Sequence, residues 1–93
     1  MIPKKFILFA ENHKVKKVKR IDRHSSEGEW NPFKNEIKIL STIPKERQGQ
    51  RYCHELVHCI LDHLGYDELS RDEIFVDQFG KCLHQILTTS QYD

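Results

Sequence analysis

The sequence has no long hydrophobic segment and few cysteines. None of its apolar runs reaches the roughly 18 residues that a membrane-spanning helix needs, which argues against a membrane protein. The run near the start, residues 6–10, is too short for a signal peptide, and charged residues follow it directly. The 3 cysteines form no C-x-x-C pair and are too few for a secreted disulfide scaffold. We therefore expect a cytoplasmic protein with reduced thiols, in which Cys53 and Cys59 pack as small apolar side chains.

Internal repeats and low-complexity segments are also absent from the sequence, so no repeat architecture is indicated. With 93 residues, 38% of them hydrophobic, the chain is expected to form one domain, residues 1–93, with a modest core. A bound metal ion would add stability that so small a core needs.

Charge of each sign is concentrated in one half of the chain. Residues 1–45 contain 11 Lys and Arg against 5 Asp and Glu, whereas residues 46–93 contain 4 against 9. The acidic half suits a cation site. The basic half contains a strip that could contact phosphates, formed by Lys14, Lys16, Lys17, Lys19, Arg20 and Arg23. The same pattern is typical of a solvated strand face, and no aromatic residues alternate with the lysines to stack single-stranded bases.

One motif indicates chemistry: His54-Glu55-Leu56-Val57-His58, an H-E-x-x-H pentapeptide. On an α-helix, residues i and i+4 lie on one face, so both imidazoles can bind one metal ion. Glu55, one step round the helix, can reach a water molecule bound to that ion. In this arrangement Zn²⁺ activates water near neutral pH, and the carboxylate accepts the proton. The alternative is a pair of histidines on a half-buried helix that binds no metal.

The surroundings of the motif predict a helix. Apolar residues recur at helical spacing over residues 48–64. Pro44 leads into this segment, and Gly65 follows it, where a left-handed C-terminal cap is expected. The pentapeptide therefore lies in the middle of a helix, as its chemistry requires.

A second helix is expected to begin at Ser70. Ser70-Arg71-Asp72-Glu73 has the form of a capping box, and Leu69 with Ile74 that of a hydrophobic staple. An apolar face then continues to Leu87, before a polar tail, residues 88–93, that we expect to fray.

Strands are expected in the first half of the chain, at residues 5–10, 14–21 and 30–40. Residues 11–13 would form the first turn, residues 23–28 a polar loop, and Asn31-Pro32 a further turn ahead of the clearest strand, residues 36–40. Strands followed by helices predict an α+β fold, with an antiparallel sheet of about three strands covered on one face by two helices. Residues 1–45 would form the strand region and residues 46–93 the metal-binding helical region.

A catalytic zinc site takes three protein ligands and leaves one position open. The longer metzincin pattern is excluded, because Leu64 stands where its third histidine would be. His63 lies about 140° round the helix from His58. His84 lies about 16 Å along the second helix from Glu73, too far to share an ion with it. We therefore expect His63 and His84 to be exposed or structural.

Three carboxylates remain, at the start of the second helix: Asp72, Glu73 and Asp77. Glu73 and Asp77 share a face, so one could bind the metal while the other orients a ligating histidine. The capping box would explain Glu73 without a metal, and counting helical levels places Asp77 opposite His58. The spacing alone leaves the choice open.

The two segments together resemble the gluzincin pattern, H-E-x-x-H followed by E-x-x-x-D, the second part being Glu73-Ile74-Phe75-Val76-Asp77. More narrowly, residues 48–87 resemble the ImmA/IrrE-type metallopeptidases, including short phage and prophage proteins. Val76, Asp77 and Gly80 differ from the usual Ala, Asn and Ala but keep their apolar or polar character. The resemblance implies zinc ligands at His54, His58 and Glu73, a general base at Glu55, and Asp77 as the partner of a ligating histidine.

The sequence therefore predicts a zinc-dependent metallopeptidase with Zn²⁺ as cofactor and Glu55 as general base. We expect it to act on a protein or peptide substrate, or on a regulatory protein, in a bacterial or phage-infected cytoplasm and away from membranes. The hydroxyl or nitrogen donor that must stabilise the oxyanion could come from Tyr52, Tyr66, Arg51 or His84. Residues 36–41 are expected at the sheet edge, where they would pair with an extended substrate.

Two other functions stay open. The chain could be a zinc-binding interaction protein with weak or no hydrolytic activity. Less favoured is a nucleic-acid-binding module that uses the basic strip at residues 14–23, with the helices as scaffold.

Overall fold

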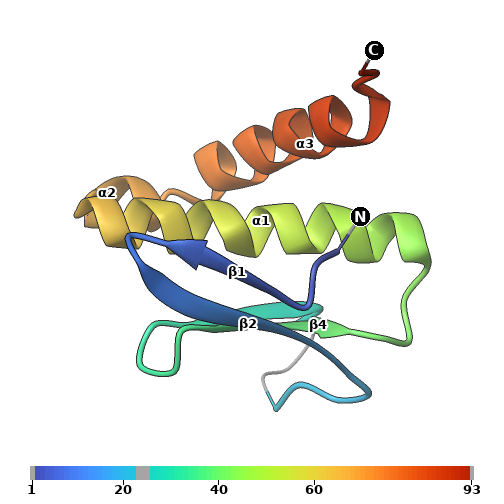
Figure 1. Ribbon diagram of the computed structural model, residues 1–93, viewed down its shortest axis with the longest axis horizontal. Helices are drawn as coiled ribbons and strands as arrows, with labels where there is room; N and C mark the ends of the chain where they lie inside the picture. The colour runs from blue at the N-terminus through green and yellow to red at the C-terminus, as the bar shows by residue number, and fades with distance from the viewer. Residues whose placement is uncertain (1, 23–25, 93) are drawn as a thin grey trace.

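The computed structural model describes residues 2–22 and 26–92 (Figure 1). Within these ranges four strands precede three helices: β1 Lys5–Leu8, β2 Glu11–Val18, β3 Gly28–Asn31, β4 Glu36–Leu40, α1 Lys45–Leu64, α2 Asp67–Ser70 and α3 Glu73–Thr89. The strands form one sheet in the order β1-β2-β4-β3. The predicted α+β fold is confirmed. The sheet is mixed, however, because β2 and β4 are parallel while the other two pairs are antiparallel.

The first hairpin turns at Phe9 and Ala10, and the turn predicted at residues 11–13 was wrong. Both residues have positive φ, 51° and 61°, and Leu8 pairs with Glu11 across them. A two-residue turn with positive φ at both positions matches the twist of paired strands, although Gly and Asn are its usual residues. Strand pairing here overrides the local preference of Phe and Ala. As a result His13 belongs to β2, where its side chain is fully buried.

The predicted strand at residues 30–40 is two strands, β3 and β4, joined by a turn. The Asn31 side-chain oxygen accepts hydrogen bonds from the backbone N–H groups of Phe33 and Lys34, at 3.0 and 3.2 Å. Asn35 completes the turn with φ of 49°. This side-chain bonding at Asn31 reverses the chain, as Asn commonly does. It places β3 at the edge of the sheet and β4 inside it, so the prediction that residues 36–41 lie at the edge was wrong.

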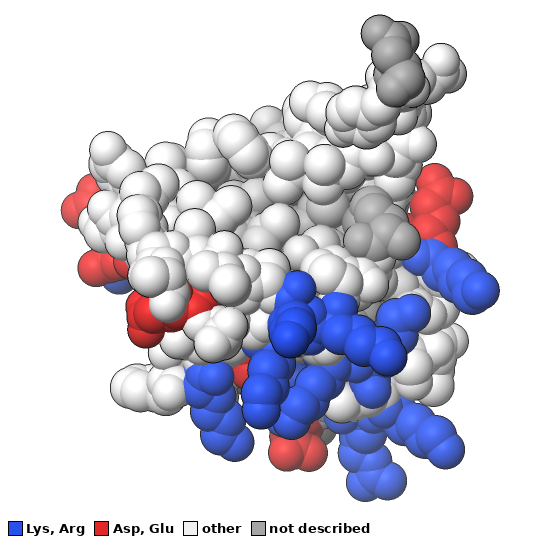
Figure 2. All heavy atoms as spheres, in the orientation of Figure 1, with Lys and Arg blue, Asp and Glu red and all other residues white. Residues whose placement is uncertain are grey.

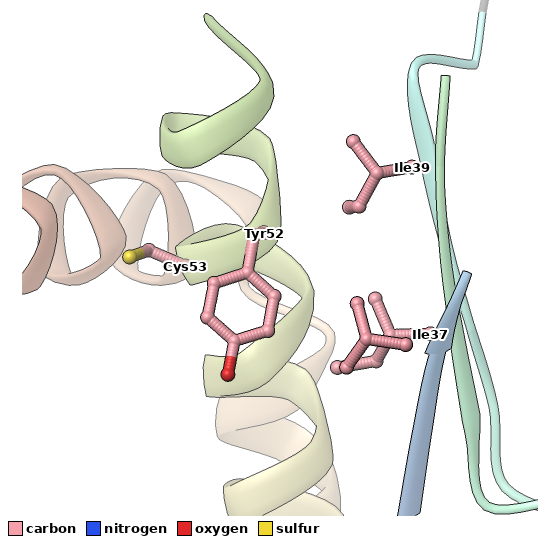
Figure 3. Close-up of a cluster of buried hydrophobic side chains, with 5 residues drawn as sticks. Ile37, Ile39, Tyr52 and Cys53 are labelled. Atoms are coloured by element: carbon pink, nitrogen blue, oxygen red, sulfur yellow. The ribbon is translucent and has the colours of Figure 1, made fainter. Parts of the chain in front are cut away.

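Helix α1 lies between the sheet and α3 (Figure 1). Ile37 and Ile39 of β4 point towards Tyr52 on one side of α1, while Cys53 points away from the sheet (Figure 3). All four side chains belong to one buried cluster. The predicted cap is confirmed: Gly65 has φ of 81°, and the N–H of Tyr66 bonds to Leu61 O. Within residues 2–22 and 26–92, no helix combines the length and the apolar character that a membrane span requires.

The capping box predicted at residues 70–73 does not form. Ser70 ends the short helix α2, and Asp72 caps α3 by accepting a hydrogen bond from Phe75 N at 3.1 Å. Asp and Ser are equally favoured at the N-cap position, and the side chain of Asp72 can reach the backbone N–H of Phe75, three residues later. Ile74 is 74% exposed, so the predicted staple is absent as well. Glu73 is therefore the first residue of α3, and its carboxylate has no capping role.

The predicted tail and the predicted loop differ in part from the structure. Helix α3 continues to Thr89, beyond the expected start of the frayed tail at residue 88. Of the predicted loop at residues 23–28, residues 23–25 lie outside the described part of the chain, as does Asp93 of the tail.

Helices α1 and α3 approach closely at Gly80. A Cβ atom built there would lie 3.1 Å from His54 Cα and 3.2 Å from His54 N. These are backbone atoms, which cannot turn aside as a flexible side chain can. The absence of a side chain at Gly80 thus lets α3 pass directly over the first histidine of the pentapeptide.

We expect Gly80→Leu to force the helices apart and lower the free energy of unfolding by about 1–3 kcal/mol, the usual cost of overpacking. It should also weaken metal binding, because the backbone of His54 must move. Urea denaturation and zinc titration measure the two effects. Gln78→Leu, at an exposed position of the same helix, is the matched control and should change neither. Equal effects of the two substitutions would contradict the packing role of Gly80.

Candidate metal centre

The middle of α1 and the first turn of α3 bring together three side chains that could bind a metal ion. A ring nitrogen of His54, one of His58 and a carboxylate oxygen of Glu73 lie within 4.8 Å of one another. Glu73 Oε2 is 3.2 Å from His54 Nε2, and Glu73 Oε1 is 3.0 Å from His58 Nε2. Ligand atoms around a tetrahedral zinc ion, with bonds of about 2.0–2.1 Å, are separated by about 3.3 Å. The spacing of these donors therefore fits a single ion.

The far nitrogens of the two rings face groups that can orient them. His58 Nδ1 lies 3.1 Å from the Ser70 hydroxyl oxygen. His54 Nδ1 is buried and makes no hydrogen bond with the residues described, and the Asp77 carboxylate lies 3.5 Å from it. Metal-bound histidines commonly donate this N–H to a carboxylate or hydroxyl. An ion on Nε2 would fix the proton on Nδ1 and give Asp77 a hydrogen to accept.

The geometry separates Glu73 from Asp77. Glu73 faces the Nε2 atoms of both histidines, whereas Asp77 approaches only Nδ1 of His54. The level counting that placed Asp77 opposite His58 assumed that α3 begins at Ser70. Because α2 takes up residues 67–70, α3 begins at Glu73 instead.

The local electrostatics favours a neutral His54 ring and an ionised Asp77 carboxylate. Burial lowers the pKa of His54 below its ordinary value, and the nearby charges of Arg51 and His58 lower it further. The neutral imidazole, which is the form that binds metal, is thereby favoured. A hydrogen bond from Lys81 is the main cause of a lowered pKa at Asp77, which keeps this carboxylate ionised beside the ring.

A cleft of about 400 Å³ adjoins the three donors. Glu55 and Arg51 of α1 line it, opposite β3 and the residues just before it. Glu55 is only 7% exposed, so its side chain meets little bulk water. Of the four suggested oxyanion donors, Arg51 lines this cleft, whereas Tyr52 is buried in the core and Tyr66 and His84 line other hollows.

Strand β3 comes very close to the helix at Gly28. A Cβ atom built there would lie 2.6 Å from Arg51 Cγ and 3.1 Å from Glu55 Cγ. Glycine thus allows the edge strand to form one wall of the cleft beside the pentapeptide.

The predicted basic strip lies on β2 and the loop after it. Lys and Arg side chains gather over this part of the molecule (Figure 2). His13 and Val15 of β2 are buried, so the exposed Lys14 and Lys16 point to the opposite face of the sheet. Lys16 forms an ion pair with Glu36 at 2.9 Å, and this hydrogen bond is the main cause of a lowered pKa at Glu36. Arg23 lies outside the described residues, and nucleic-acid binding stays a prediction.

The sequence did not predict a second group of side chains that could bind a metal ion. Donor atoms of His13, Cys59 and His63 also lie within 4.8 Å of one another. The sequence predicted an apolar role for Cys59 and an exposed or structural His63, although their i, i+4 spacing was a signal. His13 could not be recognised as a member of this group, because the sequence predicted a turn at residues 11–13.

The structure thus contains two groups that could hold a metal ion, one of buried and half-buried His and Cys side chains and one of two such His side chains with the exposed Glu73. The resemblance to the gluzincins depends on the motif residues alone. Comparison of the chain with protein-family models, with curated proteins and with solved structures found no match.

Proposed function

We propose that the chain is a zinc-dependent metallopeptidase of the gluzincin type. The convergence of two imidazole nitrogens and one carboxylate beside a cleft that Glu55 also lines supports the proposal. Two histidines and a glutamate are a donor set of catalytic zinc, with a fourth position left for water or substrate. When bound, zinc supplies a Lewis acid and a water molecule whose pKa is lowered to about 7.

The ligands and their neighbours have separate tasks in this proposal. His54 and His58 bind through Nε2, and Glu73 through its carboxylate. With the ion bound, Ser70, 3.1 Å from His58 Nδ1, and Asp77, 3.5 Å from His54 Nδ1, would accept the hydrogens of these nitrogens and hold the two rings. Helix α1 thus supplies the two imidazole ligands, and α3 supplies the carboxylate ligand.

Glu55 is the general base. Its carboxylate takes a proton from the attacking water and returns it to the nitrogen of the leaving amine, so that the amide is converted to a carboxylic acid and an amine. Arg51 donates a hydrogen bond to the oxyanion that develops on the scissile carbonyl. Both side chains line the cleft, and both lie on α1 within one turn of His54.

The substrate pairs with β3 rather than β4. Strand β3 is the last strand in the order β1-β2-β4-β3, and its residues Gly28, Glu29 and Trp30 line the cleft. An extended peptide can add to such an edge through backbone hydrogen bonds, with alternate side chains pointing into the cleft.

Removal of the metal tests the proposal directly. The chelated protein should not cleave an unfolded protein substrate, and added zinc, but not magnesium, should restore cleavage because magnesium prefers oxygen ligands. Circular dichroism shows whether the metal-free chain stays folded. Cleavage that persists in fully metal-free protein would exclude a metallopeptidase. Stoichiometric zinc without cleavage would instead favour the zinc-binding interaction protein.

A further inference from the structure

The second group of donors lies on another face of α1. Cys59 and His63 are one helical turn apart, and His13 approaches them from β2. Cys59 follows His58 and is rotated about 100° from it round the helix axis, so the two groups use different faces. His13 and Cys59 are fully buried. These three side chains therefore join the first hairpin to the C-terminal half of α1.

Backbone carbonyls fix the protons on the two histidines. His13 Nδ1 lies 3.0 Å from Glu11 O, and His63 Nδ1 lies 2.8 Å from Cys59 O. A carbonyl oxygen can only accept, so each Nδ1 carries the hydrogen and each neutral ring has its lone pair on Nε2. These two Nε2 atoms face each other at 3.3 Å. Two lone pairs at that distance repel unless a proton or a metal ion lies between them.

We propose that His13, Cys59 and His63 bind a second metal ion, Zn²⁺, with a structural role. The 3.3 Å between the two Nε2 atoms equals the separation of about 3.3 Å expected for nitrogen ligands on a tetrahedral zinc. Sulfur together with imidazole selects zinc over magnesium or calcium. On binding, the S–H bond of Cys59 breaks, the sulfur bonds to the ion and the proton passes to solvent.

Glu11 supplies the fourth ligand. Its Oε1 atom lies 3.7 Å from His63 Nε2, while its Oε2 atom accepts a hydrogen bond from Asn35 at 3.3 Å. The side chain is 58% exposed, so a small rotation can bring Oε1 to the ion. Four protein ligands leave no position for a substrate or a reactive water, as is usual in structural zinc sites. The site therefore stabilises the fold and performs no chemistry.

The second ion would support one wall of the catalytic cleft. The Trp30 ring of β3 lies 5.9 Å from the His13 ring and 5.8 Å from the His63 ring, between centroids. Its Nε1 donates a hydrogen bond to Asp62 at 2.7 Å, and Trp30 itself lines the cleft. Trp30 is the single tryptophan, and it adjoins both this site and the cleft.

Cobalt titration of the metal-free protein tests the inference. Co²⁺ gives a charge-transfer absorption band when a thiolate is a ligand, and the His54–His58–Glu73 site has no sulfur. We expect two ions per chain, one of which produces this band. Glu73→Ala should lose one ion and keep the band, whereas Cys59→Ser should lose the band and keep the other ion.

Cys82→Ser is the matched control, because Cys82 is an exposed cysteine outside both groups. It should keep two ions and the full band. Binding of a single ion without a thiolate band by the wild type would overturn the second site, whether or not the protein cleaves peptides. A band that survives Cys59→Ser would overturn it as well. The outcome is independent of the proposed peptidase activity, which has its own test.

Discussion

Glu55→Gln is expected to abolish peptide hydrolysis while zinc stays bound and the fold is unchanged. Glutamine has nearly the same shape as glutamate but cannot accept a proton from water. General-base catalysis contributes about 10²- to 10⁴-fold, and a loss of that size in kcat/KM is expected. Because Glu55 is 7% exposed at the cleft, no bulk buffer base can replace it easily. The measurements are kcat/KM on an unfolded protein and the zinc content of the variant.

Glu46→Gln is the matched control for this substitution. Glu46 lies in the first turn of the same helix and is exposed, so its replacement should leave hydrolysis intact. Hydrolysis by Glu55→Gln at the wild-type rate, with zinc bound, would refute the assignment of Glu55 as the base.

Glu73→Ala is expected to remove the ion from the His54–His58 site, and Asp77→Ala to weaken its binding about 10- to 100-fold. The order follows from position, because Glu73 faces both Nε2 atoms whereas Asp77 faces only Nδ1 of His54. Loss of Glu73 takes away a ligand. Loss of Asp77 takes away only the group that orients one.

The affinities can be measured by competition with a chelating dye in the Cys59→Ser background, so that only this site is titrated. Glu68→Ala, an exposed acid on α2, should bind zinc as the parent does. A larger loss for Asp77→Ala than for Glu73→Ala would make Asp77 the third ligand.

Local patterns were sufficient to predict the two long helices. The pentapeptide helix and its cap at Gly65 depend on apolar spacing and on one residue suited to positive φ, both of which are readable within the segment. The α+β class followed from the order of strands and helices. These features depend on neighbours in the sequence, and the structure confirms them.

Features decided by distant pairing could not be predicted. Phe9 and Ala10 have no turn chemistry of their own, and the pairing of β1 with β2 imposes their positive φ. Ser70 and Asp72 are both suited to the N-cap position of α3, and the sequence did not show that Asp72 would occupy it. His13 reaches Cys59 and His63 only through the tertiary fold. The candidate third ligand could be named from the motif, but its ranking above Asp77 needed the true start of α3.

The position of α3 on the far side of α1 from the sheet has a consequence for dynamics. This helix packs against α1 and α2, yet it delivers Glu73 to the histidines (Figure 1). Peripheral units of this kind can open without global unfolding. Release of an ion from the His54–His58 site would then be coupled to the detachment of one helix. Amide hydrogen exchange along α3 would then be slower in variants that bind zinc more tightly. Detachment of α3 from α1 would also set the rate at which the bound ion exchanges.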